Sequence, residues 1–105
     1  MNDQTKRRCE LQDLLEEILG SKQVHFQRPS NTQMSYPAIL YDIAKINKTY
    51  ADNLTYLKMR AYTVIVIDHD PDSDISEKIS ELPYCRFDRH YRSNNLNHFV
   101  YTLYY

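Results

Sequence analysis

The N-terminal part of the chain carries an apolar pattern with the period of an α-helix. Over residues 4–20, apolar side chains recur at i, i+3, i+4, i+7 and i+8, while acidic side chains take the opposite side. The apolar positions are Leu11, Leu14, Leu15, Ile18 and Leu19. Asp3 or Thr5 can cap the start, and Gly20 suits a left-handed position after the end. The pattern predicts a helix packed on a sheet, with a partner-binding helix as the alternative.

Alternating apolar and polar residues then predict three strands. A short strand covers residues 22–26, and turn formers without an apolar period fill 27–35. A long strand follows over about 38–48, and another over about 56–67 mirrors it, with Asp52-Asn53 as the turn candidate between them. Together they predict a hairpin of roughly thirty residues, well beyond two ordinary strands.

The tip of this hairpin is expected to reach beyond the core. Ordinary strands have about 5–6 residues, and a small core does not cover longer ones from end to end. A projecting two-stranded ribbon is only marginally stable alone, so we expect its tip to contact another subunit. A twisted hairpin with a solvated tip is the alternative.

An acidic turn leads from the second long strand into a second helix. Proline and acidic residues between Asp70 and Asp74 suit a first helical turn, where carboxylates complement the helix dipole. Asp74 and Glu77 have the spacing of a capping box, with Asp74 as the cap. We therefore assign Asp70, Asp72, Asp74 and Glu77 to a helix-capping acidic turn. Two strands follow, over about 85–91 and 96–105.

These elements predict a single α+β domain over residues 1–105. Their order is α-β-β-β-α-β-β, giving a mainly antiparallel sheet of four to five strands with two helices packed against it and a long projecting β-hairpin. A chain of 105 residues is long enough for one hydrophobic core but not for two.

Composition narrows the function classes. A net charge of −1 provides no overall basic field that would attract nucleic acid or a membrane surface. Cys9 and Cys85 lack metal-ligand spacing and predict free thiols in a reducing cytoplasm. A single glycine argues against phosphate-binding loops. The ten tyrosines indicate either contact surfaces or simple β-propensity.

The acidic residues from Asp68 to Asp74 raise the question of a metal site. A calcium loop starting at Asp68 would need glycine and glutamate where the chain has Ser73 and Ile79. A two-metal nuclease would need a second acidic motif, and the sequence offers none that is convincing. Helix capping explains these carboxylates, and metal binding stays as the alternative.

Two weaker patterns lie on the last two strands. His90 and His98 could meet across the final hairpin as a metal-ligand pair, although no histidines have zinc-type spacing. Arg86 and Arg89 alternate with aromatic residues, as on platforms for single-stranded nucleic acid. Regular alternation places these two arginines on opposite faces with Asp88 between them, which weakens that interpretation.

The order of several motifs resembles the small tail-completion or tail-terminator proteins (head–tail joining, minor tail) of long-tailed siphophages. The motifs are Tyr36-Pro37-Ala38-Ile39, Tyr50-Ala51-Asp52-Asn53, the segment 62–73, Leu82-Pro83-Tyr84-Cys85, Phe87-Asp88-Arg89 and Asn94-Asn95-Leu96-Asn97-His98. They cover nearly the whole chain, and they are specific as a set rather than singly.

The resemblance implies a structural virion protein and not an enzyme. Such proteins assemble in the host cytoplasm into a hexameric ring that completes the head-proximal end of the tail tube. The expected partners are further copies of the chain, the tail tube protein and the head–tail connector protein. DNA passes through the ring without sequence-specific binding, and neither a cofactor nor a membrane is involved. Terminator, neck-completion and connector-stopper roles stay open.

The expected assembly residues lie at the hairpin tip and on its charged arms. They are Lys45, Lys48, Thr49, Tyr50, Ala51, Asp52, Asn53, Lys58 and Arg60. Asp52 is the candidate for a charge pair with one of the cations across the ring. The alternative function is a small metal-dependent nuclease or nucleic-acid-binding protein that uses the turn from Asp68 to Asp74.

Overall fold

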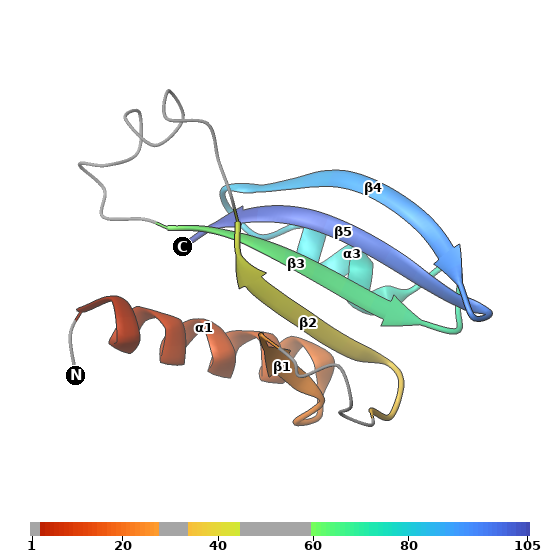
Figure 1. The fold of residues 1–105 in the computed structure, drawn as a ribbon, viewed down its shortest axis with the longest axis horizontal. Helices are drawn as coiled ribbons and strands as arrows, with labels where there is room; N and C mark the ends of the chain where they lie inside the picture. The colour runs from red at the N-terminus through yellow and green to blue at the C-terminus, as the bar shows by residue number, and fades with distance from the viewer. Residues whose placement is uncertain (1–2, 28–33, 45–59) are drawn as a thin grey trace.

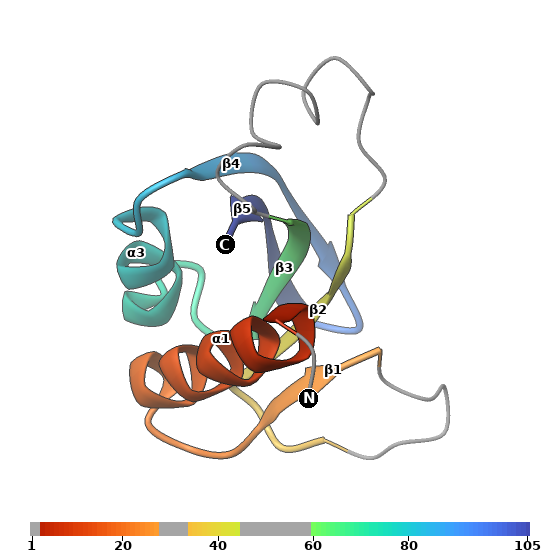
Figure 2. The same ribbon diagram turned by 90° about the vertical axis from the view of Figure 1, so that its left-hand side faces the viewer.

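The computed structural model describes residues 3–27, 34–44 and 60–105 of the chain. The elements are α1 (Asp3–Leu19), β1 (Val24–Phe26), β2 (Ala38–Ile43), β3 (Ala61–Asp68), α3 (Asp74–Ser80), β4 (Cys85–Ser93) and β5 (Leu96–Tyr104). Both helices lie on one side of a twisted sheet (Figures 1 and 2). The predicted α+β class and the predicted order of helices and strands are confirmed.

The five strands form one mixed sheet in the order β1-β2-β3-β5-β4. Strand β1 runs parallel to β2, whereas the other neighbouring pairs are antiparallel. The mainly antiparallel description therefore fails at β1, because alternation in a strand of three residues carries no information about its direction. The predicted hairpin is confirmed only where β2 pairs with β3. Its tip and the outer parts of its arms, residues 45–59, lie outside the described residues.

Helix α1 packs on the sheet through the predicted apolar stripe. Leu11 and Leu15 are fully buried, and Leu14, Ile18 and Leu19 are partly buried against the same core. The Gly20 N–H donates to the Glu16 carbonyl at 2.8 Å, and Gly20 has a φ of +80°, which is the predicted left-handed end. Asp3 and Thr5 lie within the helix, so neither is its N-cap.

One hydrophobic core lies between the helices and the sheet. Its sheet side consists of Val24, Ile39, Tyr41, Tyr62, Val64, Val66, Tyr101 and Leu103. Helix α3 contributes Ile79, which is fully buried. Full burial of one such aliphatic side chain contributes about 1.5–3 kcal/mol. The other face of the sheet, which we call the open face, is covered by no helix in the described part of the chain (Figure 2).

A β-bulge between Phe87 and Arg89 changes the direction of the side chains along β4. Arg86 pairs with Thr102 and Arg89 with Val100, two β5 residues that point to the open face. Residues three apart in a regular strand point to opposite faces, and the bulge removes this difference. The predicted placement of Arg86 and Arg89 on opposite faces is therefore wrong.

Candidate functional site

The acidic turn after β3 uses its carboxylates to bind backbone amides. Asp68 accepts a hydrogen bond from the N–H of Asp70 at 3.1 Å, and Asp70 accepts one from the N–H of Asp72 at 2.8 Å. These bonds stabilise the turn locally. Across residues 3–27, 34–44 and 60–105, no group of three His, Cys, Asp or Glu side chains is placed to hold a metal ion.

The N-cap of α3 is Ser73. Its Oγ accepts a hydrogen bond from the N–H of Ser76 at 3.2 Å. Asp74 and Glu77 occupy the first turn, where their carboxylates complement the helix dipole. The predicted cap at Asp74 is wrong by one residue. Serine and aspartate cap helices about equally well, so composition alone did not separate the two neighbours.

Buried Asn97 connects the acidic turn to the last two strands. Its Nδ2 donates to the carbonyl of His69 at 3.2 Å, and its Oδ1 lies 2.9 Å from Nε2 of His90. An amide oxygen only accepts, so His90 donates from Nε2 in this pair. The turn is therefore held in place by the fold of β4 and β5.

The two histidines of the last hairpin point to opposite faces. His90 pairs with Phe99, so the neighbouring His98 projects to the other side of the sheet. The His98 ring stacks on Tyr91, with ring centres 4.6 Å apart and an interplanar angle of 12°. The predicted meeting of His90 and His98 as metal ligands is therefore wrong.

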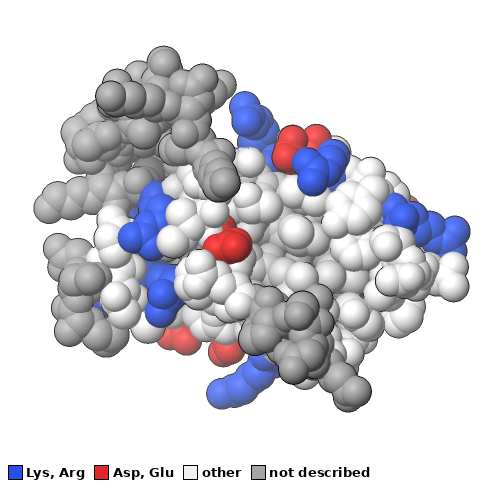
Figure 3. Space-filling model, in the orientation of Figure 1, with Lys and Arg blue, Asp and Glu red and all other residues white. Residues whose placement is uncertain are grey.

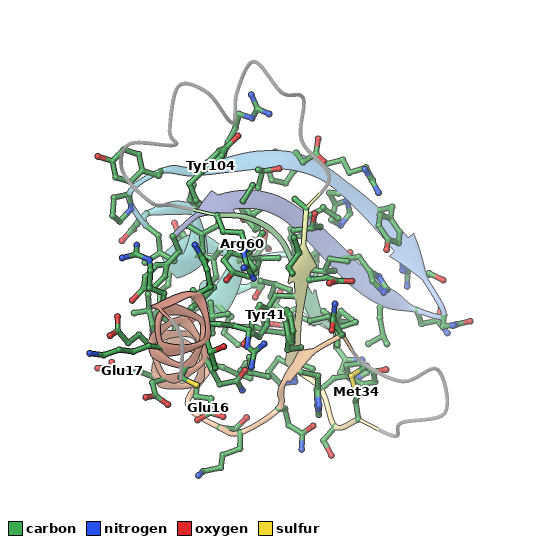
Figure 4. All side chains as sticks on the ribbon, turned by 60° about the vertical axis from the view of Figure 1, so that its left-hand side comes forward. Glu16, Glu17, Met34, Tyr41, Arg60 and Tyr104 are labelled. Atoms are coloured by element: carbon green, nitrogen blue, oxygen red, sulfur yellow. The ribbon has the colours of Figure 1, made fainter. Side chains whose placement is uncertain are left out.

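Tyr41 links β2 to α1 through a buried polar contact. Its hydroxyl donates to Oε1 of Gln12 at 2.5 Å, and Nε2 of Gln12 donates to the carbonyl of Val24 at 3.0 Å. Figure 4 shows Tyr41 between the sheet and α1. Burial raises the pKa of Tyr41 to about 12. The hydroxyl is therefore a neutral structural donor and not a general base near neutral pH.

Tyr101 makes the corresponding link between β5 and α3. Its hydroxyl donates to the carbonyl of Ser76 at 3.0 Å and also contacts the Ser76 hydroxyl. Burial raises the pKa of Tyr101 above its usual value. The contacts of Tyr41 and Tyr101 together fix both helices on the same face of the sheet.

Cys9 and Cys85 are free thiols, as predicted. Burial raises the pKa of Cys85 to about 11, which keeps this thiol protonated and a poor nucleophile. Cys9 lies exposed on α1. Cys85 is therefore not suited to covalent catalysis.

The open face contains partly exposed apolar side chains. Leu40, Thr63 and Ile65 are half-buried there, beside Asp42 at the exposed end of β2. A shallow hollow of about 420 Å³ is lined by Gln27, Leu40, Tyr41, Asp42, Thr63 and Ile65. Figure 3 views this face, and most of the described atoms that it shows belong to residues without charge. A partner that packs here would bury apolar area that the described residues leave open to solvent.

The edge strand β4 and the residue before it carry the most exposed aromatic side chains of the described residues. Tyr84, Phe87 and Tyr91 are 59%, 53% and 38% exposed. The Arg89 guanidinium lies 5.9 Å from the centre of the Tyr91 ring. We call the surface that Arg86, Arg89 and Tyr91 form on the open face the β4 patch. Arginine, tyrosine and phenylalanine are the residue types enriched at protein interfaces.

Sequence reasoning did not identify the β4 patch as a contact surface. Its residues were visible as a basic and aromatic run, but regular alternation divided them between two faces. The bulge brings Arg86, Arg89 and Tyr91 to the same face. A glycine inside a strand pattern often indicates a β-bulge, but the residue at this bulge is Asp88, which gives no such signal.

Arg60 is the predicted assembly residue that the structure describes. It precedes β3 and is half-buried. The remaining predicted assembly residues are Lys45, Lys48, Thr49, Tyr50, Ala51, Asp52, Asn53 and Lys58, and they lie outside the described residues. Their roles stay predictions.

Neither helix within the described ranges is long and apolar enough to cross a membrane. Comparisons with protein-family models, curated proteins and solved structures found no match. The function of this chain is therefore inferred from its own geometry and from the motifs that resemble tail-completion proteins.

Proposed function

We propose that the protein is a structural tail-completion protein of a long-tailed phage. Six copies form a ring at the head-proximal end of the tail tube and join the tube to the head connector. The ring surrounds the channel for DNA and acts without catalysis or a cofactor. Its partners are further copies of the chain, the tail tube protein and the connector protein.

The observation that carries this proposal is the exposed β4 patch on a sheet face that no helix of the described residues covers. Edge strands present unpaired backbone groups, and natural proteins usually shorten or cover them. Strand β4 has nine residues, of which all but Cys85 are exposed. Exposed aromatic residues on such an edge are typical of a surface that another protein chain covers. A ring subunit needs at least two such contact surfaces.

The predicted hairpin tip supplies a second contact in this proposal. Asp52 pairs with Lys58 or another cation of the neighbouring subunit, and Arg60 anchors the arm to β3. The charges at the tip set the orientation of the subunits, as charged rims of interfaces commonly do.

Charge reversal at the tip tests this contact. Asp52→Lys or Lys58→Glu alone should weaken ring formation, and the double variant should recover part of it. The free energy of unfolding of each monomer should stay within about 0.5 kcal/mol of the wild type, as for other surface substitutions. Lys22→Glu, an exposed change outside the tip, serves as the control. A matching loss of monomer stability would instead place the tip inside the subunit's own fold.

Metal titration tests the rival function. Because Asp68 and Asp70 already bind backbone amides, calorimetric titration with Mg²⁺, Mn²⁺ and Ca²⁺ should show no saturable binding. Tight binding that Asp68→Asn and Asp70→Asn abolish would favour the metal-dependent nuclease over the ring protein.

A further inference from the structure

The outer surface of α1 carries carboxylates that helix stability does not explain. Glu10, Asp13 and Glu17 are exposed and spaced at i, i+3 and i+7, so they lie on one side of the helix. Within the described residues, none of them forms an ion pair. The last turn of α1 has no basic residue, although the helix dipole disfavours a carboxylate such as Glu17 there. We call these three residues the α1 acidic stripe.

The β4 patch has the opposite charge. Arg86 and Arg89 point to the open face on the same side of the strand. Because the bulge sets them opposite Thr102 and Val100, which are two residues apart on β5, they are separated by roughly 7 Å along the strand. Glu10 and Glu17 are seven helical residues apart, which corresponds to roughly 10 Å along the helix axis. Both guanidinium groups therefore fit within the length of the acidic stripe.

The two surfaces lie on opposite faces of the sheet. Helix α1 packs on the core face, whereas Arg86 and Arg89 point to the open face. Figure 2 shows α1 and β4 on opposite sides of the molecule. One subunit cannot bring these surfaces together. Copies that contact head to tail can do so repeatedly, and such contacts close into a ring when the rotation between subunits allows it.

We propose that the β4 patch of one subunit binds the α1 acidic stripe of the next subunit in the ring. Arg86 and Arg89 face Glu10, Asp13 and Glu17 of the neighbour, and Tyr91 packs beside the guanidinium groups. The contact rests on the ring-forming function proposed above and names one of its interfaces. Its charges determine which surfaces meet and how fast they associate.

A second copy fits the β4 patch better than nucleic acid does. The net charge of −1 gives the whole chain no attraction for a polyanion. The complementary carboxylates are present on the chain itself, on the helix that covers the other face of the sheet.

A charge-swap experiment tests this contact. One variant carries Glu10→Lys, Asp13→Lys and Glu17→Lys, and the other carries Arg86→Glu and Arg89→Glu. Each variant alone meets like charges at every contact, so it should stay monomeric where the wild type forms rings. A mixture places opposite charges at both kinds of contact and should restore rings with equal numbers of the two variants. Native mass spectrometry, with and without tail tubes, measures the stoichiometry.

Two controls make the result specific. Circular dichroism and thermal unfolding establish that each variant is folded before it is mixed. Lys78→Glu reverses an exposed charge on α3 outside both surfaces and should leave ring formation unchanged.

The outcomes separate this contact from the proposed function. Rings formed by either charge-swap variant alone would overturn the contact and leave the ring function standing. Folded variants that fail to assemble on mixing would also overturn it. A wild type that stays monomeric even on tail tubes would overturn the ring function, and the contact with it. Single-stranded oligonucleotide binding that requires Arg86 and Arg89, with assembly unaffected, would assign the patch to nucleic acid instead.

Discussion

The main chains of Arg60 and Tyr105 exchange two hydrogen bonds. The N–H of Arg60 donates to the carbonyl of Tyr105, and the N–H of Tyr105 donates to the carbonyl of Arg60, each at 3.0 Å. This pair extends the ladder between β3 and β5 by one residue beyond Ala61 and Tyr104. Arg7 adds a cation–π contact, with its guanidinium 5.5 Å from the centre of the Tyr105 ring. Arg60 belongs to the hairpin arm that we propose for assembly. Tyr105, which directly follows β5, therefore anchors this arm.

Deleting Tyr105 should destabilise the subunit by about 1–3 kcal/mol, because each lost backbone hydrogen bond contributes about 0.5–1.5 kcal/mol. Tyr105→Ala keeps both backbone bonds and loses only the ring contacts, so it is the matched control. Urea unfolding followed by circular dichroism measures both variants. Equal stability of the deletion and the alanine variant would contradict a structural role for the backbone pair.

The capping residue of α3 gives a second prediction. Ser73→Ala removes the hydroxyl that accepts from Ser76 N–H and should cost about 1 kcal/mol of stability. Asp74→Ala removes only a charge that favours the helix N-terminus and should cost about 0.3–1 kcal/mol. Thermal unfolding of the two variants compares them directly. A larger loss for Asp74→Ala would restore aspartate as the cap.

The buried hydroxyl of Tyr41 makes stability depend on pH in the alkaline range. Burial raises the pKa of Tyr41 from 10.0 to about 12 in the folded protein. The unfolded chain releases this proton near pH 10, before the folded chain does, so the contribution is complete below pH 10. Above pH 10 it falls by about 1.4 kcal/mol per pH unit until the pH passes about 12.

Tyr41→Phe isolates this effect. At pH 8 the variant should be less stable than the wild type by about 1 kcal/mol, because Gln12 Oε1 loses its donor. The difference should shrink and reverse by pH 11, as the wild type loses stability and the variant lacks this hydroxyl. Urea unfolding at pH 8, 9.5 and 11 measures it, with the half-exposed Tyr36→Phe as the control. A difference independent of pH would contradict the raised pKa.

The sequence predicted the elements with strong local signals. The spacing from Leu11 to Leu19 specified the buried side of α1, and the run of β-branched residues around Val64 specified the central strand. Both signals repeat over several residues, and both arise because these apolar side chains are buried in the core. Gly20 was equally predictable, since few other residues accept a positive φ.

The remaining features depend on contacts between distant residues. The parallel direction of β1 is set by its pairing with β2, and three residues do not encode it. The bulge in β4 is set by its pairing with β5, so the common face of Arg86 and Arg89 was invisible in the sequence. Whether Ser73 or Asp74 caps α3 depends on where the helix begins, to within one residue. The β4 patch could not be predicted either, because it forms only when the bulge turns Arg86 and Arg89 to the same face.

Native mass spectrometry of the purified protein, alone and mixed with tail tubes that lack their completed end, tests the ring most directly. The proposed function predicts a single closed oligomer of six subunits, either free in solution or bound at the tube end. A protein that stays monomeric over a wide range of concentrations, and does not bind the tubes, would contradict it.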